Sequence, residues 1–432
     1  MSTDRPSIAG SGRSTVVMAV LAGLAAAAFL AGPVAWAAGN LREGFPGYFT
    51  ASRLVIEGRW SPSVYDDTTF ARETLAVTDG RIGEIYRPNP PVTSLVMLPI
   101  AGLDLMTARR AWLGLEVALV AVTWLLLLGA LPALRAPPLA LGVLALTLVW
   151  APLQLDLRMG QVYVPVLALH AAALLAIARG RARGTLVAGV ALGAAAAAKL
   201  AALPWLVVLL LRRGRRLAVA TAVATAAVLA GLTLGYAGID GWSAFASTAW
   251  HDLTADRPSL AVTAYQSTAG FLRHLLTTDA TWNPGGLADL PLVARGLGLA
   301  VSAWVAVVTI LVARRGRVDL VAAFAVTGGV LALNVAQDYA YTLLLLPAAV
   351  GLARCAAASA GRRAWTAWLA IAIALIAAPL PYRDPAFDAG WLALLAYPRL
   401  YGAWLLWAWL AREIGLQAAA DTSPQRAMAE TR

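Results

Sequence analysis

Apolar residues run in long segments along the chain, and polar residues gather in the connections between them. Most of these segments are close to the roughly 20 residues that a helix needs to cross a bilayer. A transmembrane β-barrel is disfavoured, because its strands would alternate apolar and polar positions over about ten residues. The apolar segments lie at approximately 15–38, 109–131, 138–155, 162–178, 185–211, 217–237, 291–313, 318–335, 339–354, 364–380 and 390–411.

Basic residues lie mainly in the short connections. The formal charge is +11, yet only 13% of the 432 residues are charged and 60% are hydrophobic. Soluble domains contain about 25% charged residues, so this composition predicts a polytopic membrane protein. Arginine-rich connections should lie in the cytoplasm by the positive-inside rule, which argues against a nucleic-acid surface. The basic clusters are Arg5 with Arg13, Arg135, and residues 178–184, 212–216, 314–317 and 361–363.

The apolar segment 185–211 has an arginine cluster at each end and contains the chain's only lysine, Lys199. A single crossing would leave one of these clusters outside. We therefore predict that 185–198 crosses outward, that the chain turns at Lys199, and that 200–211 returns. Fourteen helical residues reach about 21 Å, less than a hydrocarbon core of roughly 30 Å, so the turn needs protein or water around it. The result is an all-α protein with about twelve crossings (range about 10–13) and cytoplasmic termini.

Two long connections, 39–108 and 238–290, lie on the outer side in this topology. Residues 91–103 are apolar but too short to cross, so a re-entrant or interfacial helix is expected there. The first apolar run is about twice the length of a signal-peptide core, which favours an uncleaved anchor. The predicted parts are a cytoplasmic N-terminus (1–14), one transmembrane domain (15–411) whose outer loops carry juxtamembrane helices, and a disordered cytoplasmic tail (412–432).

Residues 39–92 of the first outer loop contain seven carboxylates, most of which should be solvated surface. Glu43 stands beside Phe45, Tyr48 and Phe49, whose spacing is compatible with an amphipathic helix lying on the membrane. Such a helix would hold Glu43 near the lipid headgroups. Because desolvation raises the pKa of a carboxylate, this position suits a general base.

Four further charged residues come to the same outer boundary: Arg87, Arg158, Lys199 and Asp338. Arg158 has a simple alternative as a snorkelling side chain, and Asp338 has one as a helix N-cap. Cations at headgroup depth suit a phosphate, and an intramembrane carboxylate is a candidate functional group. Together these residues indicate chemistry on a lipid-linked phosphate. The single cysteine excludes an internal disulfide and a cysteine-based zinc cluster.

The order of motifs from about residue 40 to 355 resembles the polyprenyl-phosphate-mannose-dependent mannosyltransferases of glycosyltransferase family 87, in the GT-C superfamily. "GYFTASRLVIEG" is similar to the family's aromatic-pair helix, and "NPPVTSLVMLPIAGL" to its Tyr-Pro-Pro segment. The most specific stretch, 160–216, has Gly-Gln-Val, a basic loop, a glycine-rich arm and a lysine–proline turn in that order. "YQSTAGFLRHLL" and "AQDYAYTLLLLP" resemble its Asn-Gln-Ser and Asp-His-Tyr segments.

The resemblance implies inverting transfer of a sugar, mannose in the family, from a polyprenyl-phosphate donor to a lipid or glycan acceptor. It implies a GT-C-type fold in the bacterial cytoplasmic membrane, an active site facing outward, and no cofactor, while the metal requirement stays open. Gly44 stands where the family carries an aspartate, with Glu43 one place earlier, and Tyr265 and Tyr339 replace an asparagine and a histidine. The predicted site comprises Glu43 and Asp338 (catalytic), Arg87, Arg158 and Lys199 (donor phosphate), and Tyr48, Gln161, Gln266 and Tyr339 (substrate), without metal ligands.

Two other functions remain open. A transporter or flippase for a lipid-linked substrate would use Lys199 and Asp338 as intramembrane binding groups. A non-catalytic GT-C-like assembly partner is favoured by Gly44 in place of the family's aspartate. The large asymmetric outer loops and the absence of internal repeats argue against transport. A nucleotide sugar is disfavoured as donor, because the chain has no Rossmann-type glycine fingerprint to bind it. The expected partners are therefore membrane lipids, the donor and the acceptor, and not nucleic acid.

Overall fold

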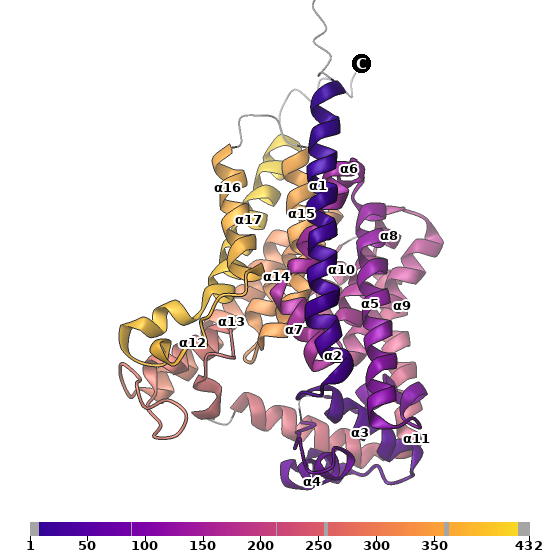
Figure 1. Cartoon of the computed structure of the whole chain (residues 1–432), viewed down its shortest axis with the longest axis vertical. Coiled ribbons are helices and arrows are strands. Elements are labelled where there is room, and N and C mark those ends of the chain that lie inside the picture. The colour runs from indigo at the N-terminus through magenta and orange to yellow at the C-terminus, as the bar shows by residue number, and fades with distance from the viewer. Residues whose placement is uncertain (1–7, 88, 213, 255–257, 358–362, 422–432) are drawn as a thin grey trace, which may run out of the picture.

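A computed structural model describes residues 8–87, 89–212, 214–254, 258–357 and 363–421 (Figure 1). The described part of the chain consists of helices joined by turns and loops. It has two isolated β-bridges, Tyr265–Gln337 and Asp279–Asn283. Long helices run side by side along the vertical axis of Figure 1, while α3, α4 and α12 lie toward the lower end. The prediction of an all-α protein is confirmed.

The helices follow the predicted apolar segments closely. In the first half they are α1 (Ile8–Phe29), continued by the π-helical turn Leu30–Val34 and α2 (Ala35–Gly39), then α3 (Phe45–Ile56), α4 (Asp67–Val77), α5 (Leu105–Ala130), α6 (Pro137–Val149), α7 (Ala151–Met159), α8 (Tyr163–Ala178), α9 (Ala182–Ala198) and α10 (Leu203–Leu210). In the second half they are α11 (Arg216–Thr254), α12 (Thr268–Leu276), α13 (Pro291–Ala313), α14 (Val318–Ala332), α15 (Leu345–Ala356), α16 (Arg363–Ala377) and α17 (Pro398–Asp421).

Several of these helices are long and apolar enough to cross a membrane. Within the described residues five qualify, or six if α6 and α7, which meet at a bend of 50°, form one span. Others, such as α8, α9, α14 and most of α16, are apolar but shorter than 18 residues. The chain is thus a multi-pass membrane protein, and the count of twelve crossings stays a prediction.

The chain breaks at Lys199, as the sequence predicts. Helix α9 ends at Ala198, and Lys199 itself has an extended backbone (φ −149°, ψ 131°) before the 3₁₀ turn Leu200–Ala202 leads into α10. Arg179, just before α9, and Arg212, just after α10, line the same cavity of about 720 Å³. The chain therefore returns to the end it left, with Lys199 at the far end of the hairpin.

Helix α9 packs closely on α11 because two glycines leave room for the backbone of that helix. A Cβ at Gly193 would lie 2.4 Å from the carbonyl oxygen of Ala222, and one at Gly189 would lie 2.6 Å from that of Ala218. Small residues of this kind allow close approach between membrane helices. The position of the Lys199 turn thus depends on the small residues of α9.

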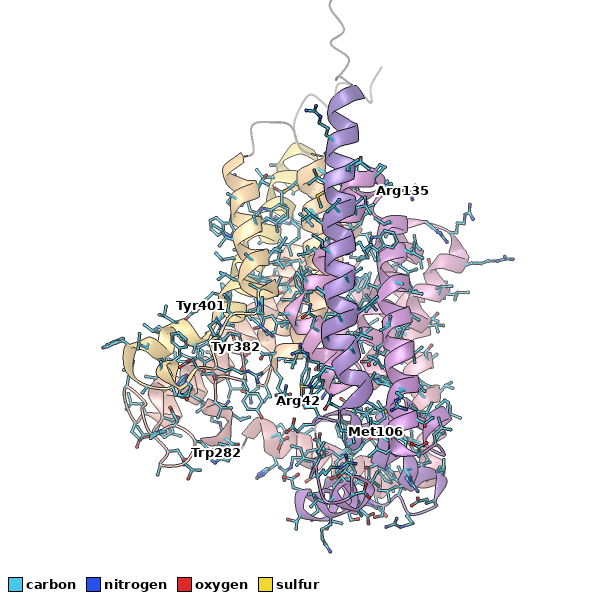
Figure 2. All side chains as sticks on the ribbon, in the orientation of Figure 1. Arg42, Met106, Arg135, Trp282, Tyr382 and Tyr401 are labelled. Atoms are coloured by element: carbon cyan, nitrogen blue, oxygen red, sulfur yellow. The ribbon has the colours of Figure 1, made fainter. Side chains whose placement is uncertain are left out.

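The basic connections gather at one end of the helix bundle. Arg135, Arg215 and Arg317 line the same cavity as Arg179 and Arg212. Figure 2 places Arg135 at the upper end of the bundle, well away from Arg42 and Tyr382, which lie lower down. This grouping is what the positive-inside rule requires, and the assignment of the basic end to the cytoplasm stays a prediction.

The aromatic face of α3 does not lie on the membrane, and that prediction is wrong. Phe45, Tyr48 and Phe49 are at most 4% exposed and pack with Trp112 and Val162 in one cluster. An apolar helix face has the same sequence pattern whether protein or lipid covers it, and here protein covers it.

Two smaller predictions also need correction. Residues 91–103 do not form one helix but two 3₁₀ turns, Pro91–Leu95 and Leu98–Ile100. Helix α17 continues through Asp421, so the first ten residues of the predicted disordered tail (412–432) are helical. The rest of that tail, and residues 1–7 of the N-terminus, lie outside the described residues.

Candidate functional site

The chain's only lysine faces a small cavity built from widely separated segments, which we call the lysine cavity. Its volume is about 120 Å³. It is lined by segments before and within α3, by the loop after α4, by the α7–α8 connection and by residues just before α15. Five predicted site residues line it, namely Glu43, Tyr48, Gln161, Lys199 and Tyr339. The structure therefore brings these five residues to one cavity, and their roles stay predictions.

Lys199 is held at the cavity by one hydrogen bond and two aromatic rings. Its Nζ donates to Oδ1 of Asn89 over 2.7 Å. The same nitrogen lies 5.5 Å from the ring centre of Tyr48 and 5.6 Å from that of Tyr163, within the range of cation–π attraction. Asn89 and both rings are neutral, and the one carboxylate that interacts electrostatically with Lys199 among the described residues is the buried Asp156.

Glu84 is the carboxylate inside the lysine cavity, and sequence reasoning placed it among the solvated surface groups. It is partly buried, and its Oε1 accepts a hydrogen bond from the backbone N–H of Gly44. Its own N–H donates to Oγ1 of Thr74 over 2.8 Å, which fixes the loop after α4. Burial, opposed by the Gly44 hydrogen bond, raises the pKa of Glu84 from 4.5 to about 7. A carboxyl with such a pKa is suited to general base catalysis near neutral pH.

Gly44 is a position where this chain tolerates no side chain. Its φ is +113°, which L residues rarely adopt. A Cβ there would lie 2.4 Å from Nε2 of Gln161 and 2.6 Å from the carbonyl oxygen of Met159. The family's aspartate therefore has no space at this position, and the Gly44 N–H instead holds the Glu84 carboxylate.

The remaining polar residues of the cavity form its walls and rim. The hydroxyl of Tyr48 donates to Oε1 of Gln161 over 2.7 Å, and the rings of Tyr163 and Tyr339 lie 5.4 Å apart. Glu43 sits on the rim, where its side chain is 62% exposed and pairs with Arg42 at 3.4 Å. Glu43 thus lacks the burial expected of it as a base.

A second cavity has a volume of about 420 Å³, and we call it the arginine cavity. It contains Arg158 and Asp338, the other two predicted site residues that line a cavity, together with Arg383 and Arg399. Asp338 pairs with Arg383 and, at 3.3 Å, with Nη1 of Arg399. Met159 and Gln337, the chain neighbours of Arg158 and Asp338, line the lysine cavity, so consecutive residues of the same two segments border the two cavities.

A buried ion pair supports the segment between the two cavities. Arg109 and Glu116 on α5 are fully buried and lie 3.4 Å apart. Nη2 of Arg109 also donates to the carbonyl oxygen of Leu157, and its guanidinium lies 5.4 Å from the ring centre of Phe45. This one side chain therefore connects α5, the end of α7 and the start of α3.

Two predicted site residues lie elsewhere. Arg87 pairs with Asp67 at 2.7 Å and with Asp252 at 3.2 Å, which joins the first outer loop to α11. The Nε2 of Gln266 donates to the carbonyl oxygens of Thr263 and Ala396, each over 2.8 Å. Neither residue lines the lysine cavity or the arginine cavity, so the geometry favours structural roles for both.

Sequence reasoning missed Glu84, Asn89, Arg383 and Arg399. Asn89 stands in the quoted segment "NPPVTSLVMLPIAGL", so a signal for it existed. Arg383 and Arg399 follow the stretch that carries the resemblance, and nothing in their sequence surroundings connects them to Asp338. Across the described residues, no group of three or more His, Cys, Asp or Glu side chains lies close enough to hold a metal ion.

Comparison with known proteins identifies one family. Residues 88–336 match the model of glycosyltransferase family 87. No curated protein and no solved structure matches the chain. The matched segment covers more than half of the chain and includes Asn89, Arg158, Gln161 and Lys199. The chain therefore belongs to glycosyltransferase family 87, a family of membrane glycosyltransferases.

Proposed function

We propose that this protein transfers a sugar, mannose in the first instance, from a polyprenyl-phosphate donor to a hydroxyl of a lipid or glycan acceptor. The observation that carries the proposal is that Lys199 and Glu84 line the same cavity. A cation suits the phosphate of the donor, and a buried carboxylate with a raised pKa suits the acceptor hydroxyl. Family membership supports glycosyl transfer between the two.

In the proposed reaction the acceptor oxygen attacks the anomeric carbon of the sugar. The bond from that carbon to the phosphate oxygen breaks, and its electron pair leaves with polyprenyl phosphate, so the configuration inverts. The hydroxyl proton passes to the carboxylate of Glu84. Lys199 and Arg158 stabilise the charge that develops on the leaving phosphate, an electrostatic contribution that is commonly large in enzymes.

The other predicted catalytic residues take supporting positions in this proposal. Glu43, on the rim, is a second candidate base that is exposed to solvent. Asp338 is paired with Arg383 and Arg399, so it suits positioning of the arginines better than removal of a proton. The lysine cavity faces the outer side of a bacterial cytoplasmic membrane, opposite the basic end of the bundle, and both termini lie in the cytoplasm.

The test is transfer by purified protein supplied with labelled polyprenyl-phosphate mannose and a membrane lipid extract. Replacing a general base typically lowers the rate about 10²- to 10⁴-fold, so Glu84→Gln should lose transfer on this scale. Glu73→Gln is the matched control, because Glu73 lies on the same outer loop and pairs with Arg59. Parallel reactions with a chelator measure the metal requirement.

Two results would oppose the proposal. Full activity of Glu84→Gln would remove it as base and return attention to Glu43, through Glu43→Gln. No transfer from any polyprenyl-phosphate sugar would favour the transporter or the assembly partner.

A further inference from the structure

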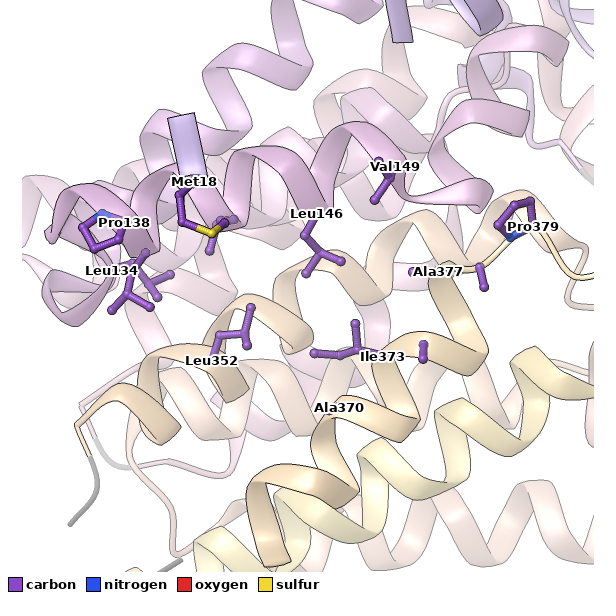
Figure 3. Close-up of a pocket in the computed structure, with 15 residues that line it drawn as sticks. Met18, Leu134, Pro138, Leu146, Val149, Leu352, Ala370, Ile373, Ala377 and Pro379 are labelled. Carbon is purple, nitrogen blue, oxygen red and sulfur yellow. The ribbon is translucent and has the colours of Figure 1, made fainter. Parts of the chain in front are cut away.

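An apolar groove runs along the outside of the helix bundle between α1, α6, α15 and α16 (Figure 3). Its volume is about 710 Å³, and only Met, Leu, Ile, Val, Ala, Gly and Pro side chains line it. The lining of α6 extends from Pro138 to Val149, twelve residues that span about 16 Å of helix. A groove of this length and composition suits a hydrocarbon chain lying along the bundle.

The groove and the arginine cavity are continuous at Pro379, which lines both of them. Pro379 follows α16, and the next residues include Tyr382 and Arg383 of the arginine cavity. In Figure 3 Pro379 and Val149 lie at one end of the groove and Pro138 at the other. A molecule in the groove would therefore present its head to the arginines.

The arginine cavity carries more positive than negative side chains. Its three arginines, Arg158, Arg383 and Arg399, face two carboxylates, Asp338 and Asp384, which leaves an excess of one positive charge. That excess matches the single negative charge of a phosphodiester.

Two of these guanidinium groups are also incompletely satisfied. Nε of Arg158 and Nε of Arg399 are buried without a hydrogen-bond partner among the described residues. Arg399 is only 5% exposed, and buried donors of this kind are costly when unpaired. An anionic group in this cavity would supply the missing acceptors.

We propose that the groove and the arginine cavity form the donor site, with the isoprenoid chain in the groove and the phosphate on Arg158, Arg383 and Arg399. This inference rests on the proposed function. It adds Arg383, Arg399 and the groove to Lys199 and Arg158, the phosphate ligands of the proposed function. Arg383, Arg399 and the groove residues on α1, α15 and α16 lie outside residues 88–336, the segment that matches the family.

The donor is favoured over the acceptor as the occupant because of where the charge develops. Breaking the glycosidic bond converts a phosphodiester into a phosphomonoester that carries additional negative charge, which three arginines stabilise. The phosphate of an acceptor lipid undergoes no such change. Consecutive residues, Arg158–Met159 and Gln337–Asp338, border the two cavities. We therefore place the sugar between the phosphate and Glu84, the arrangement that inversion requires.

Binding of polyprenyl phosphate without a sugar tests this site without requiring transfer. Purified protein is titrated with polyprenyl phosphate, with uncharged polyprenol of the same chain length, with phosphatidic acid and with inorganic phosphate, and the tryptophan fluorescence or unfolding midpoint is followed. Polyprenyl phosphate should bind most tightly. Arg399→Gln and Arg383→Gln should each weaken it roughly tenfold or more while leaving polyprenol binding unchanged.

Gly142→Leu tests the groove separately from the charges. A Cβ at Gly142 would point at the end of the Met18 side chain, 3.2 Å away, so a leucine fills the groove without meeting backbone. It should weaken both polyprenyl phosphate and polyprenol. The matched controls are Gly23→Leu, which meets nothing within 4 Å on α1, and Arg72→Gln on α4.

The outcomes separate this inference from the proposed function. Unchanged binding in Arg399→Gln and Gly142→Leu would overturn the inference even if the wild-type protein transfers mannose. Tighter binding of phosphatidic acid than of polyprenyl phosphate would overturn the choice of the donor. Tight, Arg399-dependent binding of polyprenyl phosphate with no transfer would support the inference while the proposed function fails.

Discussion

Glu84→Gln should make the protein more stable at pH 8 while removing its activity. The carboxyl of Glu84 is partly buried, and burial raises its pKa from 4.5 to about 7. The folded protein therefore binds a proton more tightly than the unfolded chain between these two values. Stability must fall as the pH rises through this window, because the folded state holds the extra proton.

The size of this effect follows from the change in pKa. A rise in pKa from 4.5 to about 7 corresponds to about 3 kcal/mol of folding free energy, at about 1.36 kcal/mol per pKa unit. Solvent at the cavity mouth screens part of it, so we expect about 1 to 3 kcal/mol. This loss of folding stability is absent below pH 4.5 and complete above about pH 7. Glutamine avoids it and retains an oxygen for the Gly44 N–H.

The assay is thermal unfolding in detergent at pH 5 and at pH 8. The quantity compared is the difference in midpoint between Glu84→Gln and the wild type, because other groups also titrate in this range. The difference should be small at pH 5 and positive at pH 8, and transfer by the wild type should decline below about pH 7, where Glu84 is protonated. A variant that is less stable than the wild type at pH 8, or a difference independent of pH, would refute the reasoning.

Three further changes have definite expected outcomes. Lys199→Ala should insert normally but bind the donor roughly 10- to 100-fold more weakly, and Lys199→Arg should recover part of the loss; unchanged donor affinity in equilibrium binding would contradict this. Gly44→Asp should lower the unfolding midpoint, because its side chain meets Gln161 and its φ is positive; wild-type stability would show that the loop adapts. Arg109→Met should cost about 3 to 5 kcal/mol by leaving Glu116 buried without its partner, and adding Glu116→Leu should restore much of it in denaturant unfolding.

Much of the helical framework was predictable because length, apolarity and arginine placement act locally. The break at Lys199 followed from arginines on both sides of one apolar segment, and the structure shows the chain returning to the same end. The same topology placed Glu43 and Lys199 at one boundary, and both line the lysine cavity. These features depend on where each apolar segment ends, and the pattern of apolar residues and arginines predicts those ends.

What the sequence did not reveal depends on which surfaces meet. The face of α3 with Phe45 and Phe49 is apolar, and the same pattern serves against lipid or protein. The pairing of Asp338 with Arg383 and Arg399 joins segments that no local spacing relates. Such contacts are set by tertiary packing, so a single sequence contains no direct signal for them.

The geometry around Gly44 and Glu84 favours the proposal that the catalytic carboxylate comes from elsewhere in the fold. From the sequence alone, Gly44 in place of an aspartate favoured Glu43 as substitute or a protein without activity. The structure shows that position 44 has no space for a side chain, and that its N–H instead binds the carboxylate of Glu84. A glycine that removes one carboxylate and seats another is better explained by relocation of the base than by loss of the reaction.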